Sequence, residues 1–197
     1  MPSYSIPAAG AEAEFRDRGS VFLAVISPVA SEEEARSALA DVERRFPDAT
    51  HWCWAWRLGA EGRERASDAG EPAGTAGKPM LQVLRGAEIS DVLAVVVRWF
   101  GGTKLGKGGL ARAYAAAVRA ALDGLPRTVR SAMRQLSLNV PYDKIGAVKR
   151  LIQPPVVVLL GERYGESVRL DLAVVEENEA ALRAALADLR LEPGTVP

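Results

Sequence analysis

Arg98-Trp-Phe-Gly-Gly-Thr-Lys-Leu-Gly-Lys-Gly-Gly-Leu-Ala-Arg112 joins the two most strongly patterned parts of this chain. Before it runs a continuous apolar segment, residues 92–97, which is long enough for a buried strand. After it comes an alanine-rich segment, residues 110–122, which has a high helix propensity. The sequence therefore predicts a central strand, a glycine-rich turn and a helix.

The glycine-rich turn has the composition of an anion-binding site. It holds Lys104 and Lys107, and no acidic residue lies between Arg98 and Arg112. Free N–H groups at the start of the helix would add to the attraction for an anion. The turn also holds five glycines that let another backbone approach closely, namely Gly101, Gly102, Gly106, Gly108 and Gly109. We expect these basic residues and glycines to bind the phosphates of RNA or of a nucleotide.

The spacing of the glycines is close to that of a P-loop, but the motif is incomplete. Gly101 and Gly106-Lys107 have the required separation, whereas Gly108 stands where Ser or Thr would hold Mg²⁺. No other apolar segment ends in an Asp that could supply a second metal ligand. Phosphate binding without hydrolysis is the favoured interpretation. A P-loop enzyme and a glycine turn that binds nothing are the alternatives.

The composition is that of a globular protein, with an uneven distribution of charge. The 197 residues are 48% hydrophobic and 25% charged, and their net charge is zero. Residues 98–134 nevertheless carry 8 basic side chains and one acidic side chain, whereas residues 1–97 carry 10 and 15. The basic block begins at the glycine-rich turn, which strengthens the expectation of an anionic partner.

Several classes of function are disfavoured by what the sequence lacks. No apolar run approaches the ~20 residues of a membrane span, so no membrane contact is expected. One cysteine and one histidine supply neither an internal disulfide nor a conventional zinc site. We expect a cytoplasmic protein without catalytic residues, metal or cofactor, and the sequence predicts no particular oligomeric state.

Residues 51–58 alternate as a strand that carries three tryptophans on one face. Trp52, Trp54 and Trp56 are expected in the core, and a platform for stacking bases is the alternative. His51 and Cys53 lie on the opposite face, about 7 Å apart along the strand, which is too far for a catalytic thiol–imidazole pair.

Residues 59–79 form a long segment without a helix or strand pattern, and such loops are usually functional or mobile. Arg63, Arg65 and Lys78 could join the phosphate contacts of the glycine-rich turn. Asp68 and Glu71 could form an acid–base pair or bind a metal. Their favoured role is to cap turns and the short helix expected over residues 79–85.

The pattern changes after residue 126, so two domains are expected. We predict an N-terminal domain over residues 1–126, a linker over 127–134 and a C-terminal domain over 135–197. The last part reads strand, helix, strand, strand, helix, which matches a ferredoxin-like module. Its final strand would have to be the short tail around Thr195-Val196. The predicted fold class is therefore α+β with two domains.

Three segments resemble the IMPACT family, in particular its bacterial YigZ-like branch. They are Ala49-Thr-His-Trp-Cys-Trp-Ala-Trp-Arg57, Ser67-Asp-Ala-Gly-Glu-Pro-Ala-Gly-Thr-Ala-Gly-Lys-Pro-Met80 and Arg98-Trp-Phe-Gly-Gly-Thr-Lys-Leu-Gly-Lys-Gly-Gly-Leu-Ala-Arg-Ala-Tyr114. The family often has a second Asp where this chain has Ala69, and Ser where it has Ala73. These departures weaken any catalytic role that depends on side chains at the two positions.

The resemblance implies a fold and a class of function. The N-terminal domain would share the ribosomal protein S5 domain 2-like fold of elongation factor G domain IV, and the C-terminal domain would resemble domain V of that factor. Eukaryotic members are translational regulators, so RNA or the ribosome is the expected partner, and a translation-related protein is a further candidate. The alternatives are a nucleotide- or phosphate-ester-dependent enzyme that uses the glycine-rich turn, and a protein-interaction module that uses the tryptophans or the C-terminal sheet.

Overall fold

The computed structural model describes residues 3–195 and shows two compact units. The first unit is Tyr4–Arg130, and the second joins Ser3 to the residues from Ser131 onward. Both units contain strands and helices. The predicted α+β class and the two-domain organisation are therefore confirmed.

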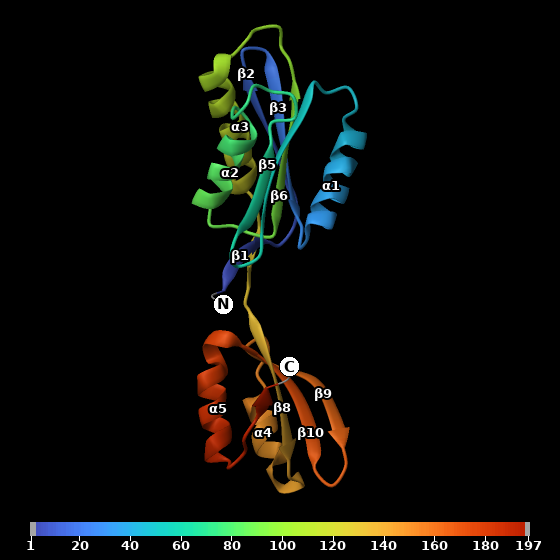
Figure 1. Ribbon diagram of the computed structural model, residues 1–197, viewed down its shortest axis with the longest axis vertical. Helices are drawn as coiled ribbons and strands as arrows, with labels where there is room; N and C mark the ends of the chain where they lie inside the picture. The colour runs from blue at the N-terminus through green and yellow to red at the C-terminus, as the bar shows by residue number, and fades with distance from the viewer. Residues whose placement is uncertain (1–2, 196–197) are drawn as a thin grey trace. The chain divides into compact units, whose positions relative to one another are not determined.

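The first unit is a five-stranded antiparallel sheet with helices on both faces (Figure 1). From one edge to the other its strands are β2 (Ala11–Asp17), β3 (Ser20–Pro28), β6 (Val92–Trp99), β4 (His51–Leu58) and β5 (Arg63–Ser67). One face carries α1 (Glu32–Arg45), and the other carries α2 (Gly77–Gly86) and α3 (Gly106–Asp123). The predicted central strand is β6, and the helix predicted after the glycine-rich turn is α3.

Strand β6 lies in the middle of the sheet and is apolar because both of its faces are covered. Ala94 and Val96 pack with residues of α2 and α3, whereas Val95 and Val97 pack on the α1 face. Successive side chains of a strand point to opposite faces. Arg98, which follows Val97, therefore belongs to the face that α2 and α3 cover.

Helix α1 starts at a capping box and covers the tryptophan-bearing face of β4. Ser31 Oγ accepts a hydrogen bond from the N–H of Glu34 at 3.1 Å. Trp56 is buried in the core beneath this helix, and Trp52 and Trp54 are half-buried in the same core. Trp56 thus packs in the core, as expected, and Trp52 and Trp54 pack partly exposed against the same core.

Helix α3 is the long helix of the unit, with 18 residues, and its alanines let it pack closely on the sheet. Leu110, Tyr114 and Val118 recur at helical spacing on its buried side. None of the helices found between residues 3 and 195 is long and apolar enough to cross a membrane.

The segment between β4 and α2 contains more regular structure than its sequence indicates. Residues 63–67 form β5, which pairs with β4, and α2 begins at Gly77. The expectation of an unstructured segment over residues 59–79 is therefore wrong for residues 63–67, and α2 starts two residues before the helix expected over 79–85. Strand β5 has the sequence Arg-Glu-Arg-Ala-Ser, whose charges suit an exposed edge strand but give no apolar alternation.

A separate two-stranded ribbon pairs β1 (Tyr4–Pro7) with β7 (Arg127–Arg130). Arg130 forms an ion pair with the buried carboxylate of Asp91, to which the hydroxyl of Tyr4 donates at 3.0 Å. Residues 127–130 therefore belong to the first unit, and most of the expected 127–134 linker lies in strands.

The second unit has ferredoxin-like topology, with strand order β11-β8-β10-β9 and helices α4 and α5 on one face (Figure 1). In chain order its elements are β8 (Met133–Val140), η1 (Tyr142–Lys144), α4 (Ile145–Leu151), β9 (Val157–Tyr164), β10 (Val168–Val175), η2 (Glu176–Asn178), α5 (Glu179–Asp188) and β11 (Gly194–Thr195). The expected final strand is thus the two-residue β11, which pairs with β8, while Val196 lies outside the described residues.

Candidate functional site

The glycine-rich turn connects the end of β6 to the start of α3 (Figure 1). Lys104 is exposed in this turn, and Lys107 and Arg112 are exposed in the first two turns of α3. None of the three has an ion pair or a side-chain hydrogen bond with another residue of the described chain. We call these three side chains the basic loop surface. Their charges are not neutralised internally, so they can attract an anion.

Helix α3 starts without a side-chain cap. Its N-cap residue is Leu105, and its first turn holds no acidic residue. The first N–H groups of a helix have no acceptor within the helix, and the helix dipole concentrates partial positive charge at this end. Lys107 lies in the first turn of α3. The helix start and the basic loop surface therefore favour the same anion.

The glycines of the turn have different physical roles. At Gly101 a Cβ atom would lie 1.9 Å from the carbonyl carbon of Gly19, so only glycine fits against the β2–β3 turn. Gly106 has a φ of +69°, a left-handed conformation that costs an L side chain about 1–2 kcal/mol. The remaining glycines are Gly102 and Gly108, both exposed, and Gly109, which is buried.

Arg98 lies in the interior, below the basic loop surface. The residue is 5% exposed, and its guanidinium forms an ion pair with Glu71. Nη2 donates to Ser20 Oγ at 3.4 Å, and the guanidinium lies 5.3 Å from the ring centre of Phe22 and 5.6 Å from that of Phe100. The sequence predicts a phosphate contact for Arg98, whereas the geometry gives it the role of holding the base of the turn.

Glu71 is the centre of a buried polar cluster. Its Oε1 accepts a hydrogen bond from the hydroxyl of Tyr114 at 2.8 Å and lies 4.0 Å from Nε2 of His51. The Sγ atom of Cys53 lies 3.3 Å from the Tyr114 hydroxyl. Together with Arg98, these residues form what we call the Glu71 network.

The Glu71 network has no activated nucleophile. Burial raises the pKa of the Cys53 thiol to about 12, so little thiolate exists at neutral pH. Burial also raises the pKa of the Tyr114 hydroxyl. The ring of His51 is bound at Nδ1 to the carbonyl oxygen of Ala69, at 3.0 Å. The thiol and the imidazole are therefore engaged separately, without the mutual hydrogen bond that a catalytic pair needs.

Asp68 caps the start of α2. Its carboxylate accepts hydrogen bonds from the N–H groups of Gly74 at 2.7 Å, Ala76 at 2.8 Å and Gly77 at 2.9 Å. Burial opposes ionisation, but the three N–H donors outweigh it and lower the pKa of the carboxyl group. Both oxygens are used, so the geometry favours capping over acid–base chemistry. No cluster of three or more metal-binding side chains occurs within residues 3–195.

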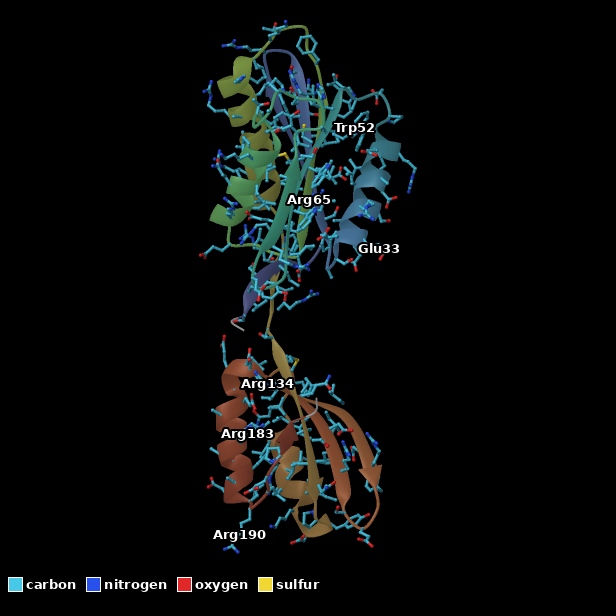
Figure 2. The ribbon with its side chains drawn as sticks, viewed as in Figure 1. Glu33, Trp52, Arg65, Arg134, Arg183 and Arg190 are labelled. Atoms are coloured by element: carbon cyan, nitrogen blue, oxygen red, sulfur yellow. The ribbon has the colours of Figure 1, made fainter. Side chains whose placement is uncertain are left out.

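The other basic residues of the 59–79 segment are divided between two faces of the sheet. Arg63 and Arg65 lie on β5 and pair with Leu58 and Trp56 of β4, which belong to the tryptophan-bearing face. Figure 2 labels Arg65 on this strand. Lys78 is exposed in the first turn of α2. The contact of Glu71 with Arg98 holds the turn before α2 at the end of β6 where the glycine-rich turn begins. Gly77, the residue before Lys78, packs against Ser67 of β5, so Lys78 begins α2 beside the edge strand.

Tyr114 and Ser20 are members of the site that sequence reasoning missed. Tyr114 carries a polar group on the otherwise apolar stripe of α3, and a buried tyrosine hydroxyl usually needs a partner. That signal was available in the sequence. Ser20 accepts from the N–H of Gly101 at 3.1 Å, and no local pattern marks it because its partner is distant along the chain.

Residues 18–122 match the Impact N-terminal domain, and residues 138–189 match a domain of unknown function, DUF1949. The chain belongs to the IMPACT family. It is 35% identical over 191 residues to the IMPACT family member YigZ of Escherichia coli (strain K12), covering 95% of this chain and 94% of YigZ. It is 34% identical over 190 residues to YvyE of Bacillus subtilis (strain 168), covering 96% and 88% of the two chains. A crystal structure of a hypothetical protein has a TM-score of 0.72 and 33% identity, over 100% of this chain and 98% of that one.

The three segments that resemble the IMPACT family meet in the Glu71 network. The first supplies Cys53, the second supplies Glu71, and the third supplies Arg98 and Tyr114. At Ala69, one departure from the family pattern, the contact with His51 uses the main-chain carbonyl oxygen, which any residue at this position would supply. The network ties the base of the glycine-rich turn to β4 and to the turn before α2.

Proposed function

We propose that this IMPACT-family protein binds RNA, free or in the ribosome, through the basic loop surface, and that it acts in translation-related regulation without catalysing a reaction. The proposal rests on Lys104, Lys107 and Arg112. These side chains are exposed, have no acidic partner in the described chain, and lie in or near the first turns of a helix that starts without a side-chain cap. Phe100, at the beginning of the same turn, is 47% exposed and offers a ring on which an unpaired base can stack.

The translation-related part of this proposal is supported by family membership, because the resemblance implies translational regulators among the eukaryotic relatives. The RNA part is supported by the charge of the turn and by the way its base is held. A turn anchored by Gly101 and Arg98 holds the backbone that carries Lys104 and Lys107, which lowers the backbone entropy lost on binding.

The alternative of a nucleotide-dependent enzyme has less support from the geometry. Gly108 supplies no hydroxyl for Mg²⁺, and both carboxylate oxygens of Asp68 and Oε1 of Glu71 are occupied by protein donors. Calorimetric titration with ATP and GTP in the presence of Mg²⁺ tests this alternative directly. Saturable, Mg²⁺-dependent binding would favour the enzyme over the RNA-binding proposal.

The first prediction concerns the two lysines. Binding to ribosomes and to labelled single-stranded RNA is measured over a salt series, for the native protein and for Lys104→Ala/Lys107→Ala. We expect the double variant to bind about tenfold more weakly at low salt. The slope of log K against log salt should become shallower by about 1.4, because two phosphate contacts are lost. The effect should be similar across RNA sequences, because phosphate contacts do not read bases.

A matched control separates the site from net charge. Arg119→Ala/Arg150→Ala also removes two exposed positive charges, but both lie outside the glycine-rich turn. This control should keep the native affinity and the native salt dependence. Equal loss in both double variants, or no loss in the lysine variant, would contradict the assignment of the basic loop surface.

A further inference from the structure

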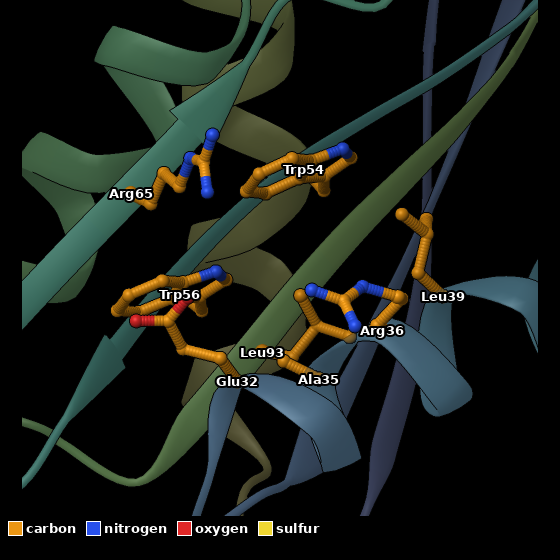
Figure 3. A pocket seen from close by; sticks show the side chains of 8 residues that line it. All are labelled: Glu32, Ala35, Arg36, Leu39, Trp54, Trp56, Arg65 and Leu93. Carbon is orange, nitrogen blue, oxygen red and sulfur yellow. The ribbon is translucent and has the colours of Figure 1, made fainter.

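A pocket of about 290 Å³ lies between α1 and the β4–β5 part of the sheet (Figure 3). Two indoles, Trp54 and Trp56, form one wall, and aliphatic side chains such as Leu93 complete it. Leu93 is near the start of β6, whereas the glycine-rich turn follows the end of that strand. The pocket also lies on the α1 face, opposite α2 and α3. It is therefore separate from the basic loop surface.

The pocket exists because α1 packs against β4 and β6 and leaves the edge strand β5 uncovered. Arg65 on β5 is directly paired with Trp56 on β4. Cβ atoms of such cross-strand partners are about 5 Å apart, so the guanidinium of Arg65 borders the indole wall. Arg36 approaches the same wall from α1 (Figure 3).

The charged groups of the pocket are not paired with one another. Arg36, Arg65 and Glu32 line it, and none of them has an ion pair or a side-chain hydrogen bond with another described residue. Two guanidinium groups face one carboxylate, so the pocket carries a net positive charge. A guanidinium binds a carboxylate through two parallel hydrogen bonds.

The four indole N–H groups of the protein fall into two classes. Trp52 donates to the carbonyl oxygen of Phe46 at 3.1 Å, and Trp99 donates to Asp48 at 3.0 Å. Neither Trp54 nor Trp56 donates to any described residue, although Trp56 is only 6% exposed. Neither indole nitrogen is buried, because the buried side-chain nitrogens without a partner in the described chain are Arg57 Nε and Arg98 Nε, so solvent or a ligand can reach both N–H groups. Both unpartnered donors belong to the lining of the pocket.

We propose that this pocket binds a small aromatic carboxylate. The guanidinium groups of Arg36 and Arg65 hold the carboxylate, and the indoles of Trp54 and Trp56 contact the flat ring. Ligand pockets commonly measure about 300–1,000 Å³, so a volume at the lower limit suits one or two fused rings. The excess of donors over acceptors in the lining selects an anion over a neutral ligand of the same shape.

The test uses nuclear magnetic resonance of the ¹⁵N-labelled full chain, titrated with 1-naphthoate. The four indole Hε1 resonances are assigned by single Trp→Phe variants. We expect saturable shifts of the Trp54 and Trp56 resonances with a dissociation constant of about 1 mM or less, while Trp52 and Trp99 stay unchanged. 1-Naphthamide, which lacks the charge, and acetate, which lacks the ring, should each bind at least about tenfold more weakly.

Two variants test the guanidinium groups. Arg65→Met and Arg36→Met keep much of the aliphatic stem and should each weaken 1-naphthoate binding about tenfold. Arg63→Met is the matched control, because Arg63 lies on the same strand two residues earlier and does not line the pocket. No indole shift at about 10 mM probe, equal binding of 1-naphthamide, equal shifts of all four indoles, or unchanged affinity in both lining variants would each overturn the proposal.

Discussion

At the scale of single residues, the ion pair of Arg98 and Glu71 decides how the site is built. Both residues are less than 9% exposed, so each charge relies on the other for compensation. A buried ion pair contributes little net stability, but removing one partner leaves an uncompensated charge in the interior. Within the described chain, Nε of Arg98 is already a buried donor without an acceptor. Without the Glu71 carboxylate, the guanidinium would keep only the neutral Oγ of Ser20 as a side-chain acceptor within the described chain.

We predict that Glu71→Gln lowers the free energy of unfolding by about 3–5 kcal/mol, because the buried guanidinium of Arg98 then lacks a counter-charge. Tyr114→Phe removes one hydrogen bond to Glu71 and should cost about 1–2 kcal/mol. Urea unfolding followed by circular dichroism at pH 7 measures both. Glu61→Gln, at an exposed position, should leave the free energy of unfolding unchanged. Losses below about 1 kcal/mol for Glu71→Gln would contradict the role of the pair.

The sequence identified the neighbourhood of this site but not the role of Arg98. Its place in a basic, glycine-rich segment suggested a surface contact with phosphate. The alternation of β6 points it inward beside Val96, but an inward position is tolerable only if a counter-charge is present. That counter-charge is Glu71, 27 residues earlier in the chain, and a single sequence does not show which distant acid supplies it.

At the scale of elements, Asp68 joins the turn after β5 to the start of α2. Asp68→Ala removes the acceptor of three N–H groups and should lower the free energy of unfolding by about 1–2 kcal/mol at pH 7. Asp123→Ala, at an exposed position at the end of α3, is the control and should change it by less than about 0.5 kcal/mol.

The same cap gives a defined pH dependence. The pKa of Asp68 is lowered in the folded protein, so its contribution is complete above the unfolded value of 3.8 and is lost as the pH falls below it. Urea unfolding of the native protein and of Asp68→Ala should therefore differ at pH 7 and converge as the pH is lowered from 4 towards 2. A difference that stays constant over this range would contradict ionic capping.

Buried helices and strands could be predicted from the sequence, because burial requires a regular pattern of apolar residues. Exposed edge strands have no such pattern and were harder to predict. Strand β6 and helix α3 are covered by other elements, so their apolar runs are explicit. Strand β5 is an edge strand with charged side chains, and it forms because β4 offers a free edge in register. That edge is a tertiary property, which the local pattern of residues 63–67 does not contain.

At the scale of the whole molecule, the chain forms two units with separate cores, and the boundary between them in the sequence lies after residue 130. The first has its cores on the two faces of the five-stranded sheet, and the second has its own core under α4 and α5. The change of composition after residue 126 indicated the boundary, but β7 extends the first unit to Arg130. Pairing with β1, more than 100 residues earlier, is again a tertiary contact.

The last prediction compares the fragments 4–130 and 4–126. Removing residues 127–130 deletes β7 and takes Arg130 from the buried carboxylate of Asp91, so the shorter fragment should be less stable by about 1–3 kcal/mol. Urea unfolding of the two fragments measures the difference. Fragment 4–130 retains the Glu71 network and the basic loop surface, and it should therefore keep the salt-dependent RNA binding proposed for the full chain. Equal stability would show that β7 is dispensable, whereas a stable fragment 4–130 without RNA affinity would place the binding surface elsewhere.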